Sequence, residues 1–339
     1  MVKRCLGLDI GGANIKVADT GNYARSWPFA MWTRSAELSA FLEHVLSEAP
    51  TTENLAVTMT GELADCFSSK AQGVNVILDA VQQVATGKDV RVYQLDGKWA
   101  TVEEARQDAL SVAAANWHAL ARFVTRATAE QNFLLVDVGS TTTDLIPIVA
   151  GAPSSRGEDD VSRLLAGELV YSGVERTPVC ALVESFPYRG EMCPVAAELF
   201  ATTLDVYLTL GDLPESVGKE HTGDGEVRSR QAACLRLSRM ICADPSQFTT
   251  KDALAAAEWI ARSQAKRLAE SITEILSGAA KKIERLFVSG HGDFLASRAF
   301  KLLALPLPVS SLSDRIGMVL SRSGPAHALA MLAAEEWAQ

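Results

Sequence analysis

The sequence predicts an α/β protein built from two related lobes that face one another across a cleft. The main observation is a duplicated pattern, in which an apolar run ends on an aspartate that is followed by an apolar residue, a glycine and a small residue. Asp9 ends the first run, and Asp137 ends the second run 128 positions later. The second observation is the length of 339 residues, which is long for one hydrophobic core and fits two domains of ordinary size.

Each copy of the pattern opens a predicted strand–turn–strand unit, the first over residues 5–18 and the second over residues 134–148. Shifting the first unit by 128 positions sets Gly11 on Gly139 and Asn14 on Thr142. Neither unit contains a P-loop pattern, and neither has the helix that follows the glycines of a Rossmann turn. The duplication therefore indicates two related lobes with facing loops, whereas a single copy would be equally compatible with an ordinary tight hairpin.

The two turns have the residue types of a phosphate and metal site. A carboxylate at the mouth of a buried strand can hold a hard divalent cation, and a glycine lets backbone N–H groups approach anionic oxygens closely. We predict that Asp9 and Asp137 hold Mg²⁺. Lys16 is a candidate phosphate contact, with a solvated strand lysine as the alternative. The predicted phosphate-binding residues in these turns are Gly11, Gly12, Ala13, Asn14, Gly139, Ser140, Thr141 and Thr142.

The remaining elements of the first lobe follow from apolar spacing. We expect helices over residues 36–48, 73–86 and 103–123, and strands over residues 55–65 and 90–95. The strand over 55–65 delivers Thr60, Glu62 and Asp65 to its C-terminal end, where α/β sheets hold ligands. The alternative for Thr60 or Asp65 is a helix cap.

In the second lobe we expect a surface loop over residues 150–160, strands over 167–174 and 179–184, and helices over 198–210, 231–241 and 251–276. Arg176 is a candidate contact for an anionic substrate, with an ion pair to Glu175 or Glu184 as the alternative. Asp205 lies in an apolar helix and needs a partner.

A third turn follows a strand at residues 286–290 and precedes a helix over 293–303. Its residues Gly290, His291 and Gly292 are predicted to lie against an anionic or flat part of the ligand, because glycine permits close approach and a helix N-terminus attracts anions. A last strand over 307–311 and a last helix over 325–337 complete the chain. We assign residues 1–133 to the first lobe, completed by residues 324–339, and residues 134–323 to the second.

Composition limits the partners. The net charge of −9 and the pI near 5.2 argue against nucleic acid and anionic membranes, which require a basic face. The sequence has no signal-peptide core and no long uncharged stretch, so we expect a cytoplasmic protein that binds small molecules. Its six cysteines include no CxxC pair, which gives no indication of zinc or disulfides. A homo-oligomer is compatible with the sequence.

The two aspartate hairpins and the late Gly-x-Gly turn, in this order, resemble the acetate and sugar kinase, Hsp70 and actin superfamily. This resemblance covers the whole chain and implies a duplicated ribonuclease H-like, actin-like ATPase fold. In that superfamily the first two loops hold phosphates with Mg²⁺, and the third lies against adenosine. The stretch Asp-Val-Gly-Ser-Thr-Thr-Thr-Asp at residues 137–144 looks like the hydantoinase and oxoprolinase branch.

Residues 57–63, 167–179 and 201–207 resemble a smaller family that is linked to tetrahydromethanopterin-dependent one-carbon metabolism. Its archaeal members include a methanofuran-biosynthesis enzyme that makes an aryl ether. The resemblance implies that an aminomethylfuran-methanol diphosphate loses diphosphate to the phenol oxygen of γ-glutamyltyramine. Lys16 would then clamp the diphosphate, and either Asp144 or Glu62 would accept the phenol proton.

Three rival functions remain open. An ATP-dependent small-molecule kinase would use the same loops for the ATP phosphates. An ATP-dependent amide-ring hydrolase like the oxoprolinases would need much larger accessory regions than this chain has. A nucleotide-sensing module would close on its ligand without turnover.

Overall fold

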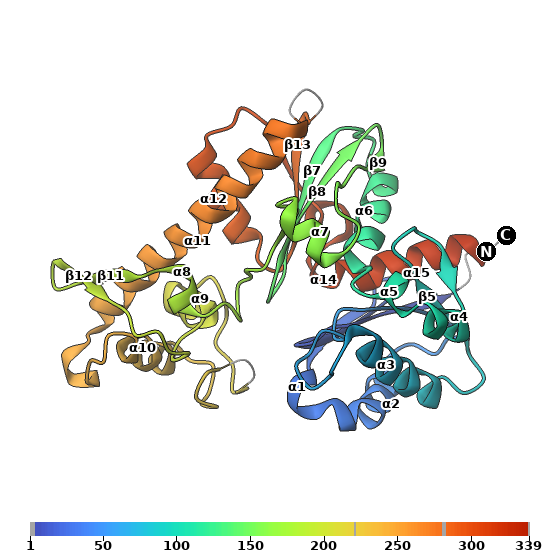
Figure 1. Cartoon of the computed structure of the whole chain (residues 1–339), viewed down its shortest axis with the longest axis horizontal. Coiled ribbons are helices and arrows are strands. Elements are labelled where there is room, and N and C mark those ends of the chain that lie inside the picture. The colour runs from blue at the N-terminus through green and yellow to red at the C-terminus, as the bar shows by residue number, and fades with distance from the viewer. Residues whose placement is uncertain (1–3, 220–221, 280–282, 338–339) are drawn as a thin grey trace.

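The computed structural model describes residues 4–219, 222–279 and 283–337. It contains two mixed sheets, each built around a hairpin and parallel strands (Figure 1). The first sheet has the order β3-β2-β1-β4-β5-β6, and the second has the order β10-β8-β7-β13-β14, with β9 paired to β8. The fold class predicted from the sequence, a two-lobed duplicated actin-like fold, is confirmed.

The first lobe contains six strands and the helices on its sheet. Its strands are β1 (Cys5–Ile10), β2 (Asn14–Asp19), β3 (Ala24–Pro28), β4 (Asn54–Met59), β5 (Asp89–Tyr93) and β6 (Trp99–Ala100). Its helices are α1 (Met31–Arg34), η1 (Ser35–Glu37), α2 (Leu38–Glu48), α3 (Lys70–Val84), α4 (Val102–Gln107) and α5 (Ala109–Val112). The apolar faces of α2 and α3 pack with β1 and β4 in one buried cluster.

The second lobe has a sheet and a long helical extension. Its strands are β7 (Phe133–Val138), β8 (Thr143–Val149), β9 (Ala152–Pro153), β10 (Leu169–Val170), β11 (Ser185–Tyr188), β12 (Glu191–Pro194), β13 (Arg285–Gly290) and β14 (Val309–Ser311). Its helices are α7 (Asp160–Leu165), α8 (Val179–Leu182), α9 (Thr203–Leu210), α10 (Arg230–Arg239), η2 (Pro245–Gln247), α11 (Thr250–Ala279), α12 (Asp293–Leu303), α13 (Ser313–Ile316) and α14 (Met318–Arg322). Helix α11 joins the sheet to the region of α8–α10 and β11–β12 (Figure 1).

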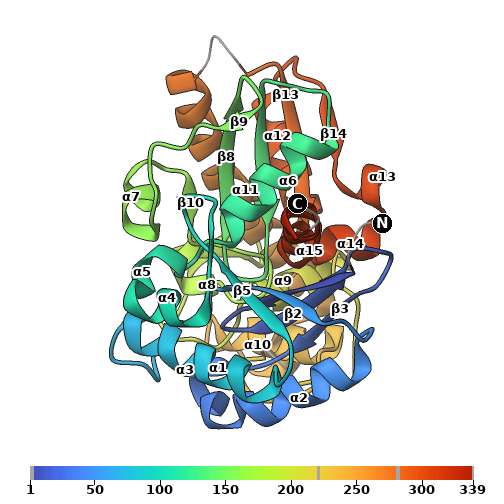
Figure 2. The same cartoon turned by 90° about the vertical axis from the view of Figure 1, so that its right-hand side faces the viewer.

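Two helices lie between the sheets. Helix α15 (Gly324–Glu336) packs on β1, β2 and β4, and α6 (Asn116–Ala127) packs on β8, β9 and α15 (Figure 2). The close crossing of α15 over β1 requires Gly7, because a Cβ there would lie 1.9 Å from the carbonyl oxygen of Ala326. The C-terminal helix thus packs on the first sheet, whereas α6 packs on the second. The exact boundary between the lobes stays a prediction.

Several predicted elements were wrong in detail. The helix expected over 198–210 begins only at Thr203, and the strand expected over 55–65 ends at Met59. The helix expected over 103–123 is broken at Asp108 and again at Ala113 to Ala115. At the second break Ala114 has φ of 51° and donates its N–H to Met59 O at 3.1 Å. The strand expected over 179–184 is the short helix α8, which follows Pro178. The strand expected over 167–174 is only the two residues of β10, because Gly173 turns the chain back against the loop after β7.

The buried Asp205 of the second lobe is paired. Asp205, which needed a partner, accepts a hydrogen bond from Arg236 Nε at 2.7 Å, and both side chains are fully buried. None of the helices in the described ranges combines the length and apolarity that crossing a bilayer requires.

Candidate active site

The two predicted hairpins have the same geometry. In the first, Asp9 on β1 pairs with Lys16 on β2, and in the second, Asp137 on β7 pairs with Asp144 on β8. Each pair is separated by the same number of residues, so the offset of 128 positions holds for both members. The duplication read from the sequence is therefore present in strand register as well.

The turns of the two hairpins are also equivalent. The N–H of Gly11 donates to Asn14 O at 3.0 Å, and the N–H of Gly139 donates to Thr142 O at 2.9 Å. The turns meet across the cleft, where Asn14 Nδ2 donates to Ser140 Oγ at 3.4 Å. Both turns face the same space between the lobes, so their remaining N–H groups and their hydroxyls can surround one anionic group there.

A cavity of about 90 Å³ lies between these turns and brings the predicted residues of both hairpins together. We call it the inner cavity. Its lining comprises Asp9, Gly11, Gly12, Ala13, Asn14, Lys16, Thr60, Asn116, Asp137, Gly139, Ser140, Thr141, Thr142, Asp144 and Pro325.

Asp9 and Asp137 lie in this cavity without full compensation of their charge. One carboxylate oxygen of each, Oδ1, is buried and accepts no hydrogen bond from any residue that the structure describes. Burial raises the pKa of both carboxyl groups, to about 6 for Asp137. Lys16 Nζ lies 3.9 Å from Asp9 Oδ2 and lowers the pKa of Asp9 in part. Unpaired buried carboxylate oxygens are suited to a cation.

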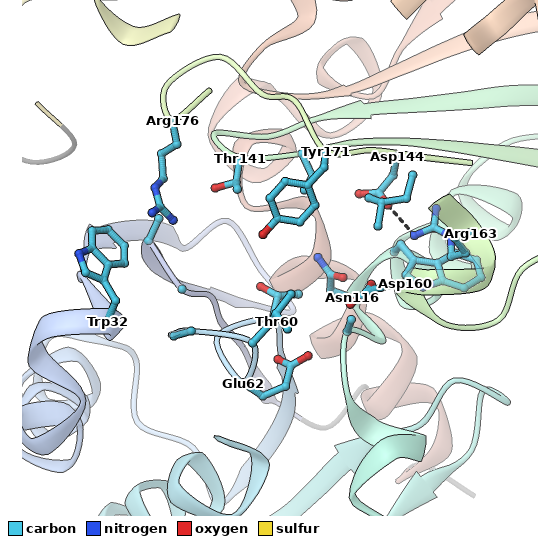
Figure 3. A pocket seen from close by; sticks show the side chains of 18 of the residues that line it. Trp32, Thr60, Glu62, Asn116, Thr141, Asp144, Asp160, Arg163, Tyr171 and Arg176 are labelled. Atoms are coloured by element: carbon cyan, nitrogen blue, oxygen red, sulfur yellow. Dashed lines mark hydrogen bonds and ion pairs between the residues drawn. The ribbon is translucent and has the colours of Figure 1, made fainter. Parts of the chain in front are cut away.

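Asp144 has a different environment from Asp9 and Asp137. Its Oδ1 accepts a hydrogen bond from Arg163 Nη1 at 2.7 Å, and the Arg163 side chain is 1% exposed. The guanidinium also stacks 4.0 Å from the ring centroid of Trp117. Burial raises the pKa of Asp144, and Arg163 opposes this rise. The carboxylate is thus held in one orientation by a partner of its own (Figure 3).

A larger cavity of about 210 Å³, the outer cavity, lies next to the inner one. The residues that line both cavities are Gly12, Ala13, Thr60, Asn116, Thr141, Thr142 and Asp144. Glu62 lies in the wall of the outer cavity and is 1% exposed. Neither of its carboxylate oxygens has a hydrogen-bond partner among the described residues. Burial raises the pKa of Glu62 to about 7, although Lys70 and the backbone near Ala114 oppose the rise.

The break between α5 and α6 contributes to the same cavity. Because Ala113 pairs with Met59 at the end of β4, the chain passes beside the turn that carries Thr60 and Glu62. Ala114 and Asn116 consequently line the outer cavity. An unbroken helix, as expected from the sequence, would not have this path.

The third predicted turn lies elsewhere. Gly290, with φ of 87°, has no room for a Cβ, which would lie 2.2 Å from Val138 O. His291 Nε2 lies 3.8 Å from Glu175 Oε1, and burial lowers the pKa of the imidazole to about 4. Neither Gly290, His291 nor Gly292 lines the inner or the outer cavity. Their phosphate role remains a prediction, and their visible role is to support the end of β7.

Several cavity residues were not singled out from the sequence. Arg163, Trp32 and Asp160 line the outer cavity and carry no motif. Lys70 of α3, which is not part of the lining, forms an ion pair of 2.5 Å with Asp160 of α7 that joins the lobes. Such residues become neighbours only when the two lobes pack. No group of three or more His, Cys, Asp or Glu side chains suited to a metal occurs in the described ranges.

Comparison with known proteins gives matches over most of the chain. The hydantoinase/oxoprolinase family model matches residues 53–335. A (4-{4-[2-(gamma-L-glutamylamino)ethyl]phenoxymethyl}furan-2-yl)methanamine synthase of Methanocaldococcus jannaschii is 32% identical over 332 residues, which cover 96% of each chain. A synthase of the same name from Methanococcus vannielii is 30% identical over 211 residues, covering 61% of this chain and 93% of the relative.

Among solved structures, the nucleotide-free structure of acetone carboxylase is similar with a TM-score of 0.55 and 11% identity. The similarity covers 96% of this chain and 70% of that chain. At this identity the match supports the fold alone.

Proposed function

The chain belongs to the hydantoinase/oxoprolinase family, and we propose that it is a transferase that forms an aryl ether with diphosphate as the leaving group. The proposed donor is an aminomethylfuran-methanol diphosphate, and the proposed acceptor is the phenol of γ-glutamyltyramine or a close analogue. The reaction would serve methanofuran-type cofactor synthesis in the cytoplasm. The names of both relatives describe a product with this ether and this γ-glutamyl group.

One observation carries the proposal: an unpaired, buried carboxylate lines a cavity that opens onto the phosphate turns. Glu62 has a pKa of about 7, so a large fraction of it is ionised at neutral pH and its conjugate acid is weak enough to take a phenol proton. Asp144 is a poorer base because its oxygen already accepts a hydrogen bond from Arg163. We therefore assign Glu62 as the general base, and Asp144 as a charged group of the cavity wall.

The proposed step balances without a further reactant. The phenol O–H transfers its proton to the Glu62 carboxylate while the phenol oxygen forms a bond to the methylene carbon on the furan. The bond from that carbon to the diphosphate oxygen breaks, and its electron pair leaves with the diphosphate. The N–H groups of Gly12 and Ser140, together with Lys16, would stabilise the negative charge that develops there, since the N–H groups of Gly11 and Gly139 are used inside their own turns.

We also propose that Asp9 and Asp137 hold Mg²⁺ together with the diphosphate. Magnesium commonly binds one or two carboxylates and completes its coordination with water and substrate phosphates, so it does not need three protein ligands. The buried, unpaired Oδ1 atoms of both residues fit this requirement. When bound, the ion would neutralise part of the charge on the leaving group.

The proposal is tested by incubating the protein with the synthetic furfuryl diphosphate, γ-glutamyltyramine and Mg²⁺. Mass spectrometry should detect the ether, and a phosphate assay should detect released diphosphate in equal amount. A parallel incubation with ATP and a panel of acceptors tests the kinase alternative. Rapid phosphoryl transfer from ATP without ether formation, by protein with a native circular dichroism spectrum, would refute the transferase assignment.

A further inference from the structure

Arg176 lines the outer cavity on the side away from Asp144 (Figure 3). Its guanidinium carbon lies 4.1 Å from the ring centroid of Trp32, which belongs to the first lobe. The contact therefore crosses the cleft and orients the guanidinium plane.

Within the part of the chain that the structure describes, no acidic side chain forms a salt bridge with Arg176. Of the two ion pairs that the sequence allows, Glu175 instead contacts Arg228 Nη2 at 3.1 Å and His291 Nε2 at 3.8 Å. Arg176 forms no ion pair with any residue in the described ranges, Glu184 included. Partial burial lowers its pKa, which is the effect of an uncompensated cation. A half-buried arginine of this kind in a cavity wall is suited to a carboxylate ligand.

The backbone fixes Arg176 relative to the phosphate turn. The N–H groups of Glu175 and Arg176 both donate to Ser140 O, at 3.0 and 3.1 Å. Gly173 permits this contact, because a Cβ there would lie 2.5 Å from the carbonyl carbon of Ser140. A group held by Arg176 is consequently held at a constant distance from the diphosphate site.

An acidic side chain lies on the facing wall. Asp65 follows β4 in the first lobe, lines the same cavity, and is close enough to Arg176 to raise its pKa. It is exposed and has no salt bridge to a described residue. The cavity thus presents one cation and one anion, from opposite lobes, outside the phosphate turns.

We propose that Arg176 and Asp65 form a subsite for an α-amino acid head group, in which Arg176 binds the carboxylate and Asp65 binds the ammonium group. The subsite would hold the γ-glutamyl end of the acceptor while the phenol reaches Glu62. This inference rests on the proposed function for its substrate, and on the cavity geometry for its residues. The acceptor would then be selected by ion pairs between its head group and these two side chains, which take no part in the ether-forming step.

The test compares three acceptors. γ-Glutamyltyramine carries both charges, 4-aminobutanoyl-tyramine lacks the α-carboxylate, and glutaryl-tyramine lacks the α-ammonium. Wild-type kcat/KM should fall about tenfold or more for each truncated acceptor, as expected when a charge-assisted hydrogen bond is lost. Arg176→Gln should remove the discrimination against 4-aminobutanoyl-tyramine only, and Asp65→Asn should remove that against glutaryl-tyramine only.

The matched control is Arg189→Gln, since Arg189 also stacks on an aromatic ring, Tyr188 at 5.0 Å, but lies on the β11–β12 hairpin. It should leave all three values unchanged. If Arg176→Gln lowered kcat/KM equally for all three acceptors, or lowered it for none of them, the proposed subsite would be overturned.

A binding measurement separates this inference from the proposed function. Calorimetry with γ-glutamylethylamide, which has the head group but no phenol, should show binding that Arg176→Gln abolishes. Binding that depends on Arg176 in a protein that forms no ether would retain the subsite and refute the transferase. Ether formation, together with head-group binding that Arg176→Gln does not change, would retain the transferase and refute the subsite.

Discussion

Replacing Glu62 by glutamine should make the ligand-free protein more stable at alkaline pH while it abolishes turnover. The unfolded glutamate ionises near pKa 4.5, whereas the folded one keeps its proton up to about pH 7. Between these values the native state binds more protons than the unfolded state, so the wild type loses stability as pH rises. Glutamine stays neutral at every pH, so the Glu62→Gln protein does not lose this stability as pH rises.

The size of the effect follows from this interval. At about 1.4 kcal/mol per pH unit, the difference between a pKa of 4.5 and one of about 7 has a ceiling of about 3 kcal/mol in the free energy of unfolding. The gain of Glu62→Gln over wild type should be near zero at about pH 4.5, grow through neutrality and level off above about pH 8.

Urea unfolding followed by circular dichroism at several pH values measures this difference directly. Glu43→Gln, on the exposed face of α2, is the matched control and should show no pH-dependent gain. The pH profile of wild-type kcat/KM should rise through the same value, about 7, as the base loses its proton. A stability difference that does not change with pH, or a wild type that is the more stable protein at pH 8, would refute the argument that Glu62 is a desolvated, unpaired base.

Three further predictions concern the turns and their support. Asp9→Ala and Asp137→Ala should each abolish ether formation while the circular dichroism spectrum stays native. Each should also remove any rise in melting temperature that Mg²⁺ with diphosphate causes in the wild type. Turnover retained by either variant would exclude the carboxylate pair as the metal site. Gly173→Ala should reduce kcat/KM at least about tenfold, because its Cβ displaces the Ser140 turn, whereas Gly278→Ala, with nothing within 4 Å, is a neutral control. Arg163→Met should lower the free energy of unfolding by about 3 kcal/mol, since Asp144 stays buried without its partner, and urea unfolding should show partial recovery when Asp144→Asn is added.

The sequence predicted the parts of the site that depend on local pattern. Asp9 and Asp137 end apolar runs, and the parallel pairing of β1 with β4 and of β7 with β13 brings the ends of these strands to one edge of each sheet. The ion pair of Arg163 with Asp144 could not be predicted, because α7 reaches β8 only through tertiary packing. For the same reason the sequence could not choose between Glu62 and Asp144 as base. The proposed choice depends on Arg163, which donates a hydrogen bond to Asp144, whereas no described residue donates one to the carboxylate of Glu62.

The duplication also explains why the two halves of the site are not interchangeable. Lys16 and Asp144 occupy the same position of their hairpins, opposite Asp9 and Asp137. The first hairpin therefore carries its own counter-charge, whereas the second places two carboxylates on neighbouring strands, and Asp144 raises the pKa of Asp137. Arg163 neutralises one of these carboxylates from outside the repeat.

No lysine or arginine among the described residues forms an ion pair with the remaining carboxylate, Asp137, and Lys16 lowers its pKa only in part. The second hairpin would therefore gain most from a bound metal ion. If so, Asp137→Asn should stabilise the ligand-free protein more than Asp9→Asn, because only Asp9 loses a lysine partner on substitution. Equal stabilisation by the two substitutions in urea unfolding at neutral pH would contradict this division of roles between the repeats.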